Sequence, residues 1–351
     1  MINLPFFSKK PGNFLGVDIG TSSVKVVELS GREDDLTLEN YGEVFMREFL
    51  GESEKKEKEG NLPFSSEEIA NALSTLLDEA GIGTRRAYFS LPDFVSFFTP
   101  LKLPPMKEEE IDSAVEHHSR QYIPLPISEV ALDWFLAEKR EEKKEVKVNL
   151  IAIPNEVIEQ YQKIASLAEM EVVALEGEML SLSRAFTRQR EGVTAIIDMG
   201  EQSTLLSVVE NGVLKTTHSL EIAGNSFIGQ IAKKASIDYN QARGIVTSYG
   251  VKEDVVKRVM SNTSQSLFSE VDRVLNSFEK KQKKEVNEVI MAGGMSLVPG
   301  MVEYARDNMT REVRVSNCFE GISYPSELED KMKSLSQSHA ISLGAALNEI
   351  T

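Results

Sequence analysis

One stretch near the N-terminus decides the fold: Gly16-Val17-Asp18-Ile19-Gly20-Thr21-Ser22-Ser23-Val24-Lys25-Val26-Val27-Glu28-Leu29. An apolar run ends at an aspartate, a glycine and three hydroxyl residues follow, and a second apolar run returns. This pattern predicts a strand, a tight turn and an antiparallel strand. Successive N–H groups and hydroxyls in such a turn can cradle phosphate oxygens, and a lysine can neutralise their charge. We therefore predict a phosphate-binding turn made by Gly20, Thr21, Ser22, Ser23 and Lys25.

The same pattern recurs in the second half of the chain, as Ile197-Asp198-Met199-Gly200-Glu201-Gln202-Ser203-Thr204. Two such turns facing each other predict a clamp between two lobes, with Gly200 and Ser203 opposite the first turn. Asp18 and Asp198, one at each strand end, can hold Mg²⁺ through its water shell. Either copy alone is equally consistent with an ordinary hairpin, because Asp and Gly are common turn residues.

A third glycine-rich turn follows a short apolar strand: Val289-Ile290-Met291-Ala292-Gly293-Gly294-Met295-Ser296. Gly293 and Gly294 allow the backbone to approach a flat ligand closely, and a helix N-terminus after the turn favours anions. The motif is neither a Walker A sequence nor a dinucleotide fingerprint, because the required lysine and glycine spacing are missing.

Composition narrows the classes of function. The 351 residues include 55 acidic and 39 basic side chains, a net charge of −16, which disfavours nucleic acid as a partner. The single cysteine, Cys318, excludes an intrachain disulfide. No apolar run approaches the ~20 residues of a membrane span. Lys9 and Lys10 follow the first apolar residues, which is the reverse of a signal peptide. We expect a cytoplasmic protein with no direct membrane span.

Hydrophobic periodicity and breaks in composition predict the organisation of the chain. Extended chain is expected to continue to Phe49, followed by a helix over 66–80 that starts at a capping box of Ser65 and Glu68. A strand–helix–strand–strand–helix order over 93–173 predicts a small inserted α/β module. The predicted parts are a first lobe core at 13–92, completed by 174–190 and 336–351; the module at 93–173; a second lobe core at 191–224, completed by 285–335; and a helical part at 225–284.

The order of the motifs resembles the actin superfamily of nucleotide-binding proteins. It runs from Asp18 through Lys25, then Asp198-Met199-Gly200, Ala292-Gly293-Gly294 and a small-residue terminal helix around Gly344. The closer resemblance is to the PilM family of type IV pilus assembly proteins. It is carried by Gly16 to Leu29, by Lys102-Leu103-Pro104 and by Leu175-Glu176-Gly177-Glu178. The resemblance implies an α/β, actin-like (ribonuclease H-like) two-lobed fold with an FtsA/PilM-type 1C subdomain at 93–173.

The resemblance also implies a function. It implies a cytoplasmic adaptor that binds ATP and Mg²⁺ between its lobes, with Gly293 and Gly294 on the adenosine and slow or no hydrolysis. Glu176 is the candidate for orienting a water, and Glu178 is the alternate. The implied partner is the short cytoplasmic tail of a PilN-like inner-membrane protein, captured near 94–103 and 108–122. Other platform proteins, and a homo-oligomer, are compatible with this class. The same scaffold serves type II secretion and competence machines.

Two features leave alternatives open. The family usually carries an Ala-Glu pair and a nearby Lys where this chain reads Ala242-Arg243, so a nucleotide-free pseudo-ATPase scaffold remains a second reading. A third possible function is that of a filament-forming division protein of the FtsA type. Such a protein is expected to have an amphipathic helix after the terminal core helix. Finally, Ile2-Asn3-Leu4-Pro5 resembles the captured tail and suggests either a mimic that fills the chain's own groove or a frayed terminus.

Overall fold

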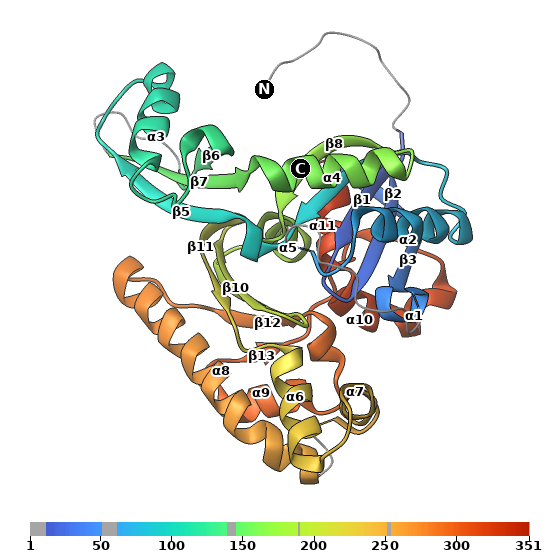
Figure 1. Ribbon diagram of the computed structural model, residues 1–351. Helices are drawn as coiled ribbons and strands as arrows, with labels where there is room; N and C mark the ends of the chain where they lie inside the picture. The colour runs from blue at the N-terminus through green and yellow to red at the C-terminus, as the bar shows by residue number, and fades with distance from the viewer. Residues whose placement is uncertain (1–11, 51–61, 139–144, 189, 251–253, 351) are drawn as a thin grey trace.

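The computed structural model describes residues 12–50, 62–138, 145–188, 190–250 and 254–350 (Figure 1). The mimic hypothesis for Ile2 to Pro5 falls outside these residues. Three sheets organise the chain. The largest has the strand order β14-β3-β2-β1-β4-β8. Its strands are β1 (Phe14–Ile19), β2 (Ser23–Arg32), β3 (Asp35–Phe45), β4 (Arg86–Leu91), β8 (Glu171–Gly177) and β14 (Ile322–Ser323).

The second sheet repeats the connections of the first, as the repeated sequence motif predicts. It has the order β11-β10-β9-β12-β13, built from β9 (Val193–Met199), β10 (Thr204–Glu210), β11 (Val213–Leu220), β12 (Glu288–Ala292) and β13 (Val313–Arg314). In both sheets an antiparallel meander of three strands is followed by a strand parallel to the first: β4 beside β1, and β12 beside β9. The two motif turns therefore occupy equivalent places in two equivalent sheets.

Helices cover both faces of the first sheet. On one face, α2 (Ser66–Glu79) and α4 (Asn155–Leu167) pack with the strands in one apolar core. The predicted capping box is present at α2, where Ser65 and Glu68 each bond the backbone N–H of the other. On the other face, α5 (Glu178–Thr187), α10 (Glu329–Ser338) and α11 (Ala340–Ala346) share a core with residues of the second sheet, which joins the lobes.

The terminal helix α11 lies directly on the strand that carries the first turn. A Cβ at Gly16 would come within 1.9 Å of the Ser342 carbonyl oxygen, and one at Gly344 within 1.8 Å of the Ser181 carbonyl oxygen. Real Cβ contacts are never that close, so only glycine lets β1 and α5 approach α11 at these points. This contact explains the small residues of the terminal helix.

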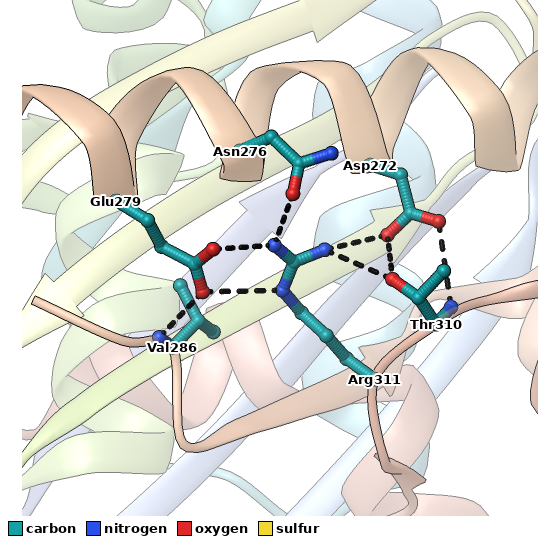
Figure 2. Close-up of polar contacts among 6 residues, drawn as sticks. All are labelled: Asp272, Asn276, Glu279, Val286, Thr310 and Arg311. Atoms are coloured by element: carbon teal, nitrogen blue, oxygen red, sulfur yellow. Dashed lines mark hydrogen bonds and ion pairs between the residues drawn. The ribbon is translucent and has the colours of Figure 1, made fainter.

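The second lobe buries its sheet under α6 (Gly224–Ala235), α7 (Tyr239–Tyr249), α8 (Asp254–Gln282) and α9 (Met301–Asn308). Figure 2 shows how α8 is anchored: the Arg311 guanidinium donates to Asp272 at 2.7 Å, to Glu279 at 2.7 Å and to Asn276 at 2.7 Å. Glu279 also accepts the backbone N–H of Val286 at 2.9 Å. One arginine thus ties two turns of the long helix to the loop before β13.

The third sheet has the order β5-β7-β6 and is made of β5 (Phe97–Leu103), β6 (Val130–Leu136) and β7 (Val146–Pro154). The helix α3 (Ile111–Ser119) shares its apolar core through Ile111 and Val115. Short 3₁₀ turns connect these and later elements: η1 (Asp93–Val95), η2 (Glu108–Glu110), η3 (Ile127–Glu129), η5 (Gly294–Leu297) and η6 (Ser326–Leu328). In Figure 1 this module projects from one side of the first lobe.

Two local expectations differ from the structure. The helix expected to complete the inserted module is α4, and it packs instead against α2, because Tyr161 and Ile164 fit the core of the first lobe. The extended chain predicted up to Phe49 ends at Phe45, where α1 (Met46–Leu50) begins and buries Met46. In the inserted module, α3 ends at Ser119, and Tyr122, which follows it, is 52% exposed.

None of the helices that the structure describes has both the length and the apolar character needed to cross a membrane.

Candidate functional site

The first turn closes between β1 and β2. The Gly20 N–H donates to the Ser23 carbonyl at 3.0 Å, and Asp18 lies opposite Lys25 in the strand register. The Lys25 ammonium lies 3.7 Å from Asp18 Oδ2 and 3.8 Å from Glu43 Oε1. The Ser23 hydroxyl donates to Glu43 Oε1 at 2.8 Å. The lysine ammonium therefore lies beside the end of the strand that leads into the turn.

The second turn is a copy of the first in backbone geometry. The Gly200 N–H donates to the Ser203 carbonyl at 3.0 Å, the same bond at the same place. A Cβ at Gly20 would meet the Ser23 carbonyl oxygen at 3.1 Å, and one at Gly200 the Ser203 carbonyl oxygen at 3.0 Å, so both turns leave little room for a side chain. The start of α6 rests on this turn, because the Gly224 N–H donates to the Gly200 carbonyl at 3.0 Å.

The third turn follows β12, which runs parallel to β9 with Ala292 opposite Asp198. Gly293 has a φ of +84°, which favours glycine, and its N–H donates to the Gln337 carbonyl at 2.8 Å. Ser296 donates to the Gly293 carbonyl at 2.6 Å and receives a bond from the Gln337 amide at 2.9 Å. These bonds fix the backbone that leads into Gly294.

All three turns face one cavity of about 340 Å³ between the lobes. Eleven of the twelve residues assigned from the sequence line it: Asp18, Gly20, Thr21, Ser22, Ser23, Lys25, Asp198, Gly200, Ser203, Gly293 and Gly294. Segments far apart in the sequence thus meet at one place, where strand ends of two sheets converge. The second lobe adds apolar lining from Ile228, Val246 and Val298.

The cavity is rich in carboxylates. Among the described residues that line it, two are cations, Lys25 and Arg243, whereas five carry carboxylates: Asp18, Glu43, Glu178, Asp198 and Glu201. An anionic ligand would be repelled by this lining unless a cation came with it.

Burial and mutual repulsion shift the ionisation of these groups. Burial raises the pKa of Asp198 to about 7, with Lys25 opposing the shift and Asp18 adding to it. Burial also raises the pKa of Asp18, against the pull of Lys25. Desolvation opposes the charge on Lys25, but the carboxylates of Asp18 and Glu43 outweigh it and raise the pKa of the lysine. Lys25 therefore stays charged while its carboxylate neighbours compete for it.

Glu176 is the one assigned residue that the structure places outside the cavity. Its carboxylate accepts two bonds from Arg184, at 2.7 and 2.8 Å, one from Ser181 at 2.6 Å and one from Asn348 at 2.6 Å. Arg184 also donates to the Gly344 carbonyl at 2.6 Å, so this network fastens α5 to α11. A carboxylate held by four donors has no free edge for a water, and the assignment to Glu176 has to be corrected.

The alternate, Glu178, lines the cavity. It is the first residue of α5, immediately after the end of β8. Its Oε1 accepts the backbone N–H of Asp93 at 2.9 Å. Burial, followed by the charge of Asp93, raises the pKa of Glu178 well above its ordinary value.

Two arginine–aromatic contacts join the lobes beside the cavity. The Arg243 guanidinium on α7 lies 5.7 Å from the ring centre of Phe45 on β3. The Arg47 guanidinium on α1 lies 5.2 Å from the ring centre of Tyr239 on α7. Tyr239 donates to Glu201 at 3.2 Å, next to the second turn. Each contact is a cation–π pair worth about 0.5–1 kcal/mol at an exposed site. Arg243, where the family usually has Glu, thus contacts the opposite lobe.

Sequence reasoning missed Glu43, Asp93 and Glu201. Glu43 could have been found from strand pairing, because β3 returns antiparallel to β2 and places Glu43 opposite Lys25. Glu201 stands in the second turn, directly after Gly200, and its place in the repeated motif could have marked it. Asp93 reaches the second turn from a distant part of the sequence, and no local pattern marks it.

The residues present fit a magnesium nucleotide. A Cβ built on Gly294 meets nothing within 4 Å, so the backbone there borders open cavity, as close approach of a flat ligand requires. Among the described residues no group of three or more His, Cys, Asp or Glu could hold a metal directly. The carboxylates of Asp18 and Asp198 both line the cavity, and carboxylates can hold Mg²⁺ through its water shell, because this ion dehydrates reluctantly.

The duplicated sheets and the cavity between them define an actin-like protein of two lobes. The chain belongs to the PilM family of type IV pilus assembly proteins, whose family model matches residues 16–350.

Comparison with individual proteins agrees with this assignment. A solved structure of a PilM–PilN type IV pilus biogenesis complex superposes with a TM-score of 0.82 at 21% identity, over 96% of this chain and 98% of that one. The ethanolamine utilization protein EutJ from Carboxydothermus hydrogenoformans has a TM-score of 0.58 at 14% identity, over 95% and 90%. The cell division protein FtsA of Streptococcus pneumoniae serotype 2 (strain D39 / NCTC 7466) is 21% identical over 348 residues, 85% of this chain and 74% of FtsA. At these identities the structural likeness establishes the fold alone.

Proposed function

We propose that this protein is an ATP-binding adaptor of the inner-membrane platform that assembles type IV pili or a related secretion or competence machine. The proposal that the protein binds a nucleotide rests on one observation: the two Asp-Gly turns and the Gly-Gly turn all line the same cavity. Backbone N–H groups and hydroxyls from both lobes thus border one space of ligand size, as a phosphate clamp requires.

Each assigned residue has a role in this proposal. Backbone N–H groups and hydroxyls of Gly20, Thr21, Ser22 and Ser23 hold phosphate oxygens, with Lys25 supplying charge, and Gly200 and Ser203 act from the other lobe. Gly293 and Gly294 border the adenosine. Asp18 and Asp198 hold the water shell of Mg²⁺. When bound, that ion neutralises phosphate charge which the acidic lining would otherwise repel.

The geometry favours slow hydrolysis. Glu178 replaces Glu176 as the residue that could orient a water, since it is the one that borders the cavity. Burial and the charge of Asp93 raise the pKa of Glu178 and so favour the protonated carboxyl, and a protonated carboxyl cannot accept a proton from water. We propose that ATP acts mainly as a ligand that sets the conformation of the adaptor.

Titration calorimetry with Mg-ATP tests this part. Lys25→Met should abolish binding, whereas Lys163→Met should not, because Lys163 is a surface residue paired with Glu67 at 3.1 Å. No binding by the unaltered protein would contradict the proposal and leave the nucleotide-free scaffold as the function.

The partner part of the proposal is supported by the PilM–PilN complex, whose fold this chain shares over nearly its full length. We propose that the module around β5 and α3 captures the cytoplasmic N-terminal tail of a PilN-like membrane protein, which would hold this chain at the inner membrane. Tyr122 is 52% exposed within this region. Tyr249 is 60% exposed and is the last residue of α7, a helix that Figure 1 shows far from the module.

Fluorescence anisotropy with a labelled tail peptide tests the partner. Tyr122→Ala should weaken binding and Tyr249→Ala should not; equal affinities would contradict the location. A variant lacking residues 2–7 should bind the peptide more tightly if the N-terminus mimics the tail, and unchanged affinity would rule the mimic out.

A further inference from the structure

Asp93 connects the two lobes at the edge of the cavity. It lies on η1, the turn that leads from β4 of the first sheet toward β5, and it is 6% exposed. Its neighbours Pro92 and Phe94 line the cavity. The Ser203 hydroxyl of the second turn donates to Asp93 Oδ1 at 3.1 Å, so a side chain of the first lobe binds the phosphate turn of the second.

This bond excludes another. A serine hydroxyl has a single O–H to donate, and an ionised phosphate oxygen can only accept. Ser203 therefore cannot donate to Asp93 and to a phosphate at the same time. While it donates to Asp93, the Ser203 hydroxyl is not available to a phosphate oxygen.

The second carboxylate oxygen of Asp93 has few partners. Asp93 Oδ2 is buried, and the group beside it that can donate to the Asp93 side chain is the Glu178 carboxyl when that carboxyl holds a proton. An ionised Glu178 would leave Oδ2 without a donor, which is costly in a buried place. The negative charge of Asp93, next to the cavity-lining residues Pro92 and Phe94, also opposes a phosphate that approaches the second turn.

We propose that Asp93 is an internal competitor of the nucleotide phosphate: it binds the Ser203 hydroxyl and must release it before that hydroxyl can bind the ligand. The inference rests on the proposed function, since it concerns the same cavity. Asp93 is in this sense a positioning residue that acts through Ser203 and sets the affinity of the clamp.

The contacts of Asp93 allow its side chain to be tested separately from its backbone. The Asp93 N–H, which donates to Glu178 Oε1, survives any substitution except proline. Asp93→Asn removes the charge but keeps an oxygen for Ser203, whereas Asp93→Ala removes both. Asp330→Ala, at an exposed position in the first turn of α10, is the matched control.

Calorimetry with Mg-ATP and with Mg-tripolyphosphate, which has no base, measures the competition. Freeing a hydrogen bond to a charged group should tighten binding of both probes about tenfold in Asp93→Ala, with a smaller gain in Asp93→Asn. In a Ser203→Ala background the gain from Asp93→Ala should shrink, because no hydroxyl is left to compete for. A structural role would instead weaken binding in every Asp93 variant.

A second readout needs no ligand. Hydrogen–deuterium exchange of residues 200–204 in the unliganded protein should rise in Asp93→Ala and stay unchanged in Asp330→Ala. Unchanged exchange, or equal or weaker binding in Asp93→Ala while the unaltered protein binds Mg-ATP, would overturn the inference alone. No binding of either probe by any variant would overturn the proposed function as well. Asp93→Asn, which keeps the hydrogen bond, serves if Asp93→Ala fails to fold.

Discussion

Gly294→Val should block ligand binding without harming the fold. A Cβ on Gly294 meets no atom within 4 Å, and the residue lines the cavity, so the new side chain would extend into the space reserved for the ligand. Gly294 is not among the residues with positive φ, so valine introduces no backbone strain there. Crowding a close-packed contact costs about 1–3 kcal/mol. Affinity for Mg-ATP should therefore fall about 5- to 150-fold.

The adjacent glycine should behave in the opposite way. Gly293 has a φ of +84°, and a Cβ there would lie 2.5 Å from the Met199 carbonyl oxygen and 2.7 Å from Asp198 Oδ1. Left-handed backbone costs about 1–2 kcal/mol for a residue with a Cβ, and the clash adds to it. Gly293→Ala should therefore lower the unfolding midpoint, whereas Gly294→Val should leave it unchanged.

Calorimetric titration with Mg-ATP and thermal unfolding of the same samples distinguish the two effects. Gly229→Val is the control, because Gly229 on α6 also has open space around its Cβ but does not line the cavity. If Gly294→Val bound Mg-ATP as tightly as the unaltered protein at an unchanged midpoint, the ligand would not contact the third turn, and the reasoning would fail.

Three further predictions concern the cation, the anchor of α8 and a buried histidine. Chelating Mg²⁺ should abolish ATP binding, since five lining carboxylates oppose the phosphates; calorimetry in EDTA that shows undiminished binding would contradict this. Arg311→Met should destabilise the protein by about 2–4 kcal/mol in urea unfolding, because Asp272 and Glu279 lose their shared partner, whereas Arg314→Met, at a side chain 55% exposed, should cost under about 1 kcal/mol; equal losses would contradict the anchor. Burial, aided by the charge of Lys25, lowers the pKa of His339 to about 3. The His339 side chain therefore stays neutral in the folded protein, whereas in the unfolded chain it gains a proton below about pH 6.5. Stability should therefore fall by about 2 kcal/mol between pH 7 and pH 5, and His339→Gln should remove that dependence; parallel pH profiles for the two proteins would refute it.

The parts of the site that the sequence could predict are those made by consecutive residues. The turn from Asp18 to Lys25 is defined by strand patterning, a glycine and hydroxyls within eight residues, and its copy at Asp198 follows the same rule. Because the two copies are equivalent, their sheets repeat the same strand order. The repeat in the sequence is therefore enough to predict that the two turns face each other.

The parts that could not be predicted depend on tertiary packing. Glu176 and Glu178 are two residues apart and chemically alike, yet one lies at the end of β8 among the donors of α5 and the terminal residues, and the other begins α5 at the cavity. The break between strand and helix at Gly177 decides which faces the ligand. Asp93 reaches Ser203 over 110 positions of sequence, and α4 joins the first lobe although it follows the module's last strand.

The central claim is that two copies of one turn hold a nucleotide from opposite lobes. A crystal structure of the protein with Mg²⁺ and a nonhydrolysable ATP analogue tests it most directly. The account predicts phosphate oxygens within hydrogen-bond distance of both the Gly20–Ser23 and the Gly200–Ser203 turns, with the base beside Gly294. A nucleotide bound elsewhere would contradict the claim. So would a nucleotide whose phosphates contact one turn and lie beyond hydrogen-bond distance of the other.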